Sequence, residues 1–138
     1  MQDLVTYRSV KEGEREFFYC QLIYDDNGNN LLEVEVKQRI DNIFANIKKC
    51  GSLTELIKIG GDKTKAYLNH TCKILLDYFI CVQTEFVYFV KEDIETISQN
   101  IIQNCNIKKL VENASWQDIE KTAIFLKNSY AQTSFSNI

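Results

Sequence analysis

The stretch from Lys73 to Val90, KILLDYFICVQTEFVYFV, constrains the fold more than any other part of the chain. Thirteen of its eighteen residues are apolar or aromatic. A helix that spans a bilayer needs about 20 nearly uninterrupted apolar residues, and Asp77, Gln83 and Glu85 interrupt this run. We therefore expect no transmembrane segment here, and predict that the stretch forms the centre of a soluble core that the other segments cover.

The residue types in this stretch favour strands, because most of them are β-branched or aromatic. We predict strands within about residues 65–90, with a tight turn near Gln83 and Thr84. The spacing of Leu75, Phe79 and Val82 also fits one face of a helix, and periodicity alone does not separate the two. The alternative is an all-α bundle with a buried central helix over residues 63–90.

A second strand signal lies nearer the N-terminus. Residues 17–24, FFYCQLIY, are followed by the turn sequence DDNGNN, and residues 31–37, LLEVEVK, alternate apolar and charged side chains. Asn-Gly between two such runs is typical of a β-hairpin, because both residues tolerate positive φ. These features predict a hairpin over residues 17–37 with one buried and one solvent-exposed face.

The remaining segments show helical spacing. Apolar side chains recur at helical intervals over residues 40–47, and Gly51 follows as a stop signal. Ser52 is typical of the start of a second helix, over about residues 53–58, which Gly60-Gly61 should end. The same pattern predicts further helical segments, over about residues 92–105, 107–111 and, after a capping Ser115, 116–129.

Together these elements predict an α+β domain, with an antiparallel sheet and helices packed on one of its faces. We expect one domain over residues 1–138, frayed at residues 1–13 and 131–138. The element order is similar to that of longin or SNARE-like domains and of small α+β protein subunits of ribonuclease P. The resemblance covers element order alone, and a shared fold does not imply a shared function.

Cysteine usage bears on the compartment. The chain has five cysteines, an odd number without close paired spacing, and its first ten residues lack the apolar segment of a secretory signal. These features favour reduced thiols and an intracellular location, cytoplasmic or nuclear. The cysteines also lack the spacing of a structural zinc site, and we expect no metal and no cofactor.

Three local patterns invite a chemical interpretation, and each has a simpler one. His70 and Cys72 would share a face of a strand, but a nucleophile also needs an oriented base. Residues 25–30 lack the glutamate that completes a calcium loop, and Asn-Gly turn chemistry explains them. A Cys72 or Cys81 nucleophile is a third hypothesis, but cysteines in such apolar stretches are typically small buried hydrophobic side chains. We predict no catalytic residues and a protein that is not an enzyme.

The leading functional hypothesis is a non-catalytic protein–protein interaction domain, an adaptor or subunit of a larger assembly. Seven Tyr, eight Phe and one Trp are more aromatic area than a core of this size easily hides, and aromatic residues are enriched at interfaces. Such a domain would bind a protein partner, or itself, through an exposed sheet edge or helix groove.

The alternative is a nucleic-acid-associated, RNA-binding subunit. The net charge of −3 and pI of about 5.2 argue against a large basic footprint. A local patch would use scattered lysines to contact phosphates: Lys48, Lys49, Lys58, Lys63, Lys65, Lys108 and Lys109.

Overall fold

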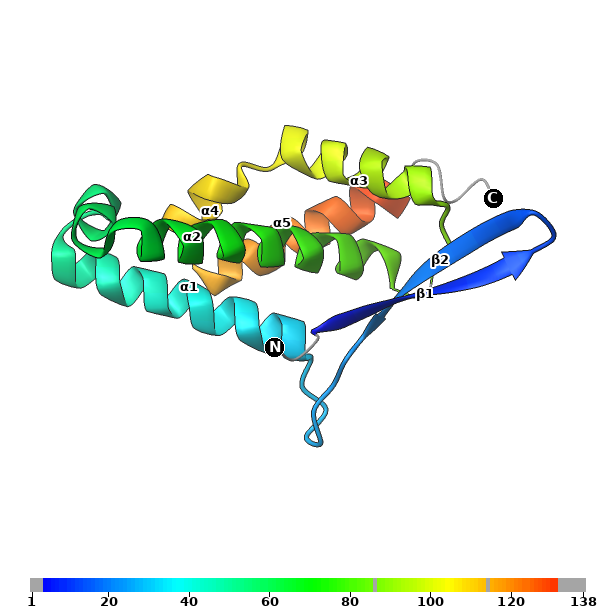
Figure 1. Ribbon diagram of the computed structural model, residues 1–138, viewed down its shortest axis with the longest axis horizontal. Coiled ribbons are helices and arrows are strands. Elements are labelled where there is room, and N and C mark those ends of the chain that lie inside the picture. The colour runs from blue at the N-terminus through cyan, green and yellow to red at the C-terminus, as the bar shows by residue number, and fades with distance from the viewer. Residues whose placement is uncertain (1–3, 86, 114, 132–138) are drawn as a thin grey trace.

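The computed structural model describes residues 4–85, 87–113 and 115–131, which form two strands and five helices (Figure 1). The α+β class predicted from the sequence is confirmed. In chain order the elements are β1 (Val5–Glu12), β2 (Arg15–Leu22), α1 (Leu31–Cys50), α2 (Leu53–Thr84), α3 (Lys91–Asn104), α4 (Ile107–Asn113) and α5 (Trp116–Ala131).

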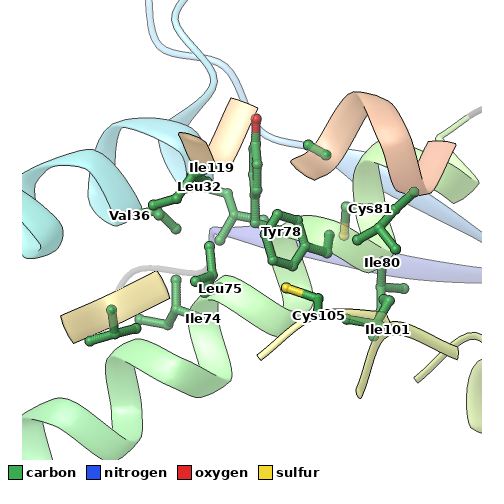
Figure 2. Close-up of a cluster of buried hydrophobic side chains, with 14 of the residues drawn as sticks. Leu32, Val36, Ile74, Leu75, Tyr78, Ile80, Cys81, Ile101, Cys105 and Ile119 are labelled. Atoms are coloured by element: carbon green, nitrogen blue, oxygen red, sulfur yellow. The ribbon is translucent and has the colours of Figure 1, made fainter. Parts of the chain in front are cut away.

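Helix α2 is the centre of the molecule. It packs against α1, α3, α4, α5 and β2, so its buried side chains are spread over more than one face. Leu75, Phe79 and Cys81 are fully buried, and the ring of Tyr78 lies near Leu32 of α1 and Ile119 of α5 (Figure 2). The prediction that the apolar stretch forms the centre of the core is therefore confirmed.

The prediction of strands within about residues 65–90 is wrong for residues 65–84, which are helical. The helix alternative for 63–90 is correct up to Thr84, although the bundle is not all-α. No residue near Gln83 and Thr84 supplies the positive φ that a two-residue hairpin turn requires. Instead, their side chains donate to the carbonyls one turn earlier, Gln83 to Phe79 at 2.7 Å and Thr84 to Ile80 at 2.9 Å.

The predicted hairpin over residues 17–37 is also wrong. β2 pairs with β1 in antiparallel register, from Val5 opposite Leu22 to Glu12 opposite Arg15, and Gly13 takes the positive φ of the turn. The expectation of fraying over residues 1–13 therefore fails for β1. Residues 1–3 and 132–138, also expected to fray, lie outside the described residues.

Residues 31–37 begin α1 because Asn30 caps it. The Asn30 side chain accepts from the backbone N–H of Leu32 at 3.0 Å and of Glu33 at 3.4 Å. Leu32 and Val36, both buried, are four residues apart, a spacing that fits strand alternation and a helix equally well. The alternation that suggested a strand was thus the buried face of a helix.

The DDNGNN sequence does form a tight turn. Asp25 accepts from the backbone N–H of Asn27 and of Asn29, both at 2.9 Å, and these bonds lower the pKa of the carboxyl group. Gly28 takes a φ of 82°. This turn chemistry is as predicted, but the turn connects β2 to a helix.

Most predicted helix ends are confirmed. Gly51 ends α1 in a left-handed conformation, and the Ser52 hydroxyl caps α2 by accepting from the N–H of Glu55 at 3.1 Å. Gly60-Gly61 does not end the helix over 53–58. It produces a kink at Gly61, after which α2 continues to Thr84. The helices predicted over 92–105, 107–111 and 116–129 correspond to α3, α4 and α5.

The long helical segment at residues 65–84 also removes the resemblance in element order to longin-like domains and ribonuclease P subunits, which depended on central strands.

Where a sheet was predicted, the core contains the packed pair of helices α1 and α2. Arg39 links the two helices. Its guanidinium donates to Glu35 at 2.9 Å and to Thr71 at 3.1 Å, lies 3.1 Å from Nδ1 of His70, and stacks 4.6 Å from the ring centre of Tyr67.

The kink yields a prediction. Gly61 has φ 61° and ψ −141°, a region that is essentially restricted to glycine. Replacing Gly61 with Asn should lower the free energy of unfolding by about 1–3 kcal/mol, measured by urea unfolding with circular dichroism. Gly51→Asn is the matched control, since Gly51 lies in the left-handed helical region that Asn tolerates. Equal losses for the two variants would contradict this explanation of the kink.

Candidate interaction surface

The hairpin is attached to the helices by the segment that follows α2. Phe18 and Phe89 exchange two backbone hydrogen bonds, N–H to O distances of 2.7 and 2.9 Å, and their rings stack with centroids 6.2 Å apart. Phe89 is 2% exposed. Cys20 forms a further bridge with Glu85. Phe89 and Glu85 therefore each make an isolated bridge to β2, outside the two-stranded sheet.

One face of the hairpin packs on the helices. Cys20 and Leu22 are buried there, and the Tyr7 hydroxyl lies 3.6 Å from Sγ of Cys81 on α2. Burial raises the pKa of the Tyr7 hydroxyl. A hydrogen bond with Cys20, together with burial, raises the pKa of the Cys81 thiol. This contact joins β1 to α2.

The opposite face of the hairpin carries apolar and aromatic side chains toward solvent. Side chains alternate between faces along a strand, so Val10, Phe17 and Tyr19 lie opposite the buried set. Tyr19 packs edge-to-face on Tyr88, with ring centroids 5.5 Å apart. Val10 is 40% exposed and Tyr88 is 57% exposed. We call Val10, Phe17, Tyr19 and Tyr88 the outer aromatic face.

The outer edge of β1 is open in the described part of the chain, where β1 pairs with β2 alone. The Phe18 backbone groups bond to Phe89 and so point away from β1. Ser9 lies opposite Phe18, and in antiparallel pairs the backbone groups of such a residue point away from its partner strand. By alternation, Tyr7, Ser9 and Lys11 present N–H and C=O groups at the open edge.

This open edge was not among the sites predicted from the sequence, because the predicted hairpin lay over residues 17–37. A signal was present. Gly13 stands between the run from Val5 to Val10 and the aromatic run that begins at Phe17. The stronger Asn-Gly signal at residues 27–28 led to the prediction that the aromatic run pairs with residues 31–37 instead.

The seven lysines of the nucleic-acid hypothesis are all exposed. The structure brings five of them to one end of the molecule, around the α1–α2 turn and the kink, at the opposite end from the hairpin tip (Figure 1). Glu55 and Asp62 lie in the same segment. The five are Lys48, Lys49, Lys58, Lys63 and Lys65, whereas Lys108 and Lys109 lie on α4.

The proposed approach of His70 to Cys72 along a strand does not occur, because both lie on α2 and residues two apart on a helix point to different sides. His70 instead faces Arg39. All five cysteines are free thiols. Burial raises the pKa of the Cys72 thiol. The pKa of the Cys81 thiol is also raised. Neither environment generates the thiolate that a nucleophile requires.

A polar hollow of about 380 Å³ lies beside the turn that precedes α1. Glu33, Tyr78, Lys127 and Glu85 line it, and the Tyr24 hydroxyl donates to Glu85 at 3.3 Å. Burial, with the charges of Glu33 and Glu120, raises the pKa of Tyr78 to about 12. Among the described residues, no three His, Cys, Asp or Glu side chains are grouped to hold a metal ion.

Comparison of the chain with protein-family models, with curated proteins and with solved structures finds no significant match. Over residues 4–85, 87–113 and 115–131, no helix is both long enough and apolar enough to cross a bilayer. Function must therefore be inferred from the surface of the molecule itself.

The attachment of the hairpin gives a second prediction. Phe89→Ala removes a buried ring from between the hairpin and the helices, and should lower the free energy of unfolding by about 3–5 kcal/mol. It should also raise amide exchange in β1 and β2 more than in α1. Tyr88→Ala, at the exposed neighbouring position, should cost about 1 kcal/mol or less. A Phe89→Ala protein with unchanged hairpin exchange would show that this contact does not anchor the hairpin.

Proposed function

We propose that the protein is a non-catalytic interaction domain, an adaptor or subunit, that binds an extended segment of a protein partner at the open edge of β1. The observation that carries the proposal is the row of outward backbone groups at Tyr7, Ser9 and Lys11. An exposed edge is a template for an added strand, whose backbone bonds supply affinity.

The outer aromatic face supports the same proposal. A strand added beside β1 would extend the sheet, and its side chains would lie next to Val10 and the aromatic rings beyond it. Aromatic side chains are enriched in interface cores and often dominate binding energy. The hairpin thus combines non-selective backbone pairing with a selective side-chain surface.

The environments of the cysteines support an intracellular setting for this function. All five are free, and Cys20, Cys81 and Cys105 are buried. Reduced thiols of this kind persist in the cytosol and nucleus, where glutathione and thioredoxin maintain them. We propose that location for the interaction as well.

A proline at Ser9 tests the proposal. Ser9→Pro removes an outward N–H without removing a bond to β2, and proline is tolerated on edge strands in this orientation. We expect Ser9→Pro to lose the partner, whether another protein or a second copy, while keeping its circular dichroism spectrum. Binding is measured by quantitative capture from the source extract and by sedimentation of the purified chain.

Ser9→Ala, which keeps the backbone donor, is the matched control and should bind like the wild type. A partner retained equally by Ser9→Pro and Ser9→Ala would show that the edge is not the binding site. A wild-type chain that is monomeric and retains no partner would overturn the proposed function.

A second candidate function is weak RNA binding, favoured by the gathering of five lysines around the α1–α2 turn. Binding through lysine–phosphate contacts weakens steeply with salt. Titration of a labelled RNA at low and moderate salt tests it, with Lys48 and Lys49 replaced by Gln in a control variant. No binding at low salt, or binding that the double replacement leaves unchanged, would remove this candidate.

A further inference from the structure

We infer that the partner at the open edge of β1 is a second copy of this chain, paired through antiparallel β1 strands with Val10 at the two-fold axis. The inference rests on the proposed function, since it names the occupant of that edge. It is carried by the self-complementary sequence of β1, VTYRSVKE, read in the register that the backbone permits.

The backbone limits which residues of the two β1 strands can face one another. Tyr7, Ser9 and Lys11 present their N–H and C=O groups at the edge, whereas Arg8 and Val10 use theirs toward β2. In an antiparallel pair, residues that face each other are of the same kind, both bonded or both unbonded across that pair. Odd-numbered residues therefore face odd-numbered ones, and even-numbered residues face even-numbered ones.

Charge selects among these registers. A two-fold axis at Val10 places Arg8 of each copy opposite Glu12 of the other, which makes two opposite-charge pairs. An axis at Arg8 would place like charges face to face, as would an axis at Lys11. An axis at Ser9 would place Arg8 opposite Val10. Opposite-charge cross-strand pairs stabilise a sheet and like-charge pairs destabilise it.

The same register also continues the apolar surface. Val10 lies opposite Phe17 within one hairpin, so the Val10 side chains of the two copies would join a Phe17–Val10–Val10–Phe17 row across the extended sheet. In the adjacent row, Glu12 already lies opposite Arg15 of its own hairpin. It would then lie between two arginines, Arg15 and Arg8 of the other copy. Both rows lie on the side of the sheet that carries the outer aromatic face.

The shape of the molecule leaves room for this pairing. The hairpin tip extends beyond the helices, away from the α1–α2 turn (Figure 1). In the Val10-centred register, Gly13 at the tip of one copy reaches Tyr7 of the other, so the shared length is residues 7–13. A contact of this length is smaller than a standard stable interface, and we expect a reversible dimer that forms with increasing concentration.

Charge reversal at the two paired positions tests the inference. Sedimentation equilibrium over a range of concentrations at low salt should show a wild-type monomer–dimer equilibrium. Arg8→Glu and Glu12→Arg, each alone, place like charges opposite one another twice, and each should weaken self-association about tenfold or more. An equimolar mixture of the two variants, and the double variant R8E/E12R, should both recover dimers, because positions 8 and 12 of the two copies again face each other with opposite charges.

Each outcome decides the inference, and circular dichroism verifies that all variants are folded. A wild-type monomer at every concentration overturns it, as does a dimer that neither reversal weakens or a mixture that does not recover. If the wild type is monomeric but binds another protein, and Ser9→Pro abolishes that binding, the proposed function stands and the second-copy inference is wrong. Loss of dimers in Ser9→Pro with recovery in the charge-swapped mixture supports both.

Discussion

The pair of hydrogen bonds between Phe18 and Phe89 is the constraint on which the rest of the surface depends. It attaches β2 to the segment after α2, and its geometry decides which way every backbone group of the hairpin points. Because Phe18 bonds toward Phe89, Ser9 must point outward. The same pairing places Tyr88 beside Tyr19 and so builds the outer aromatic face. The direction of the open edge thus follows from one backbone contact.

The helical part of the structure was largely predictable from local signals. Gly51, Ser52 and Ser115 mark helix ends where the sequence places them, because caps depend on groups close by in the chain. The class was also predictable, but the strands within it were not. Val and Phe residues between 73 and 84 suit a strand, yet contacts with every other helix hold them in α2, as tertiary packing often overrides propensity.

The candidate surface was harder to predict for a related reason. Residues 17–24 can pair with the apolar run before them or with the one after them, and the Asn27-Gly28 turn is a stronger local hairpin signal than Gly13. Asn30 caps α1, so residues 31–37 are helical and β2 pairs with β1 instead. Five of the seven predicted lysines lie at one end of the molecule because the chain reverses direction between α1 and α2. Their spacing in the sequence does not predict that reversal.

Amide hydrogen exchange along β1 tests the central claim most directly. At low protein concentration, exchange measured by NMR should alternate along β1. It should be slow at Arg8 and Val10, whose N–H groups face β2, and fast at Ser9 and Lys11, whose N–H groups face outward. Slow exchange at Ser9 and Lys11 in the dilute monomer, or no alternation at all, would show that the edge is covered or the register different, and would contradict the account.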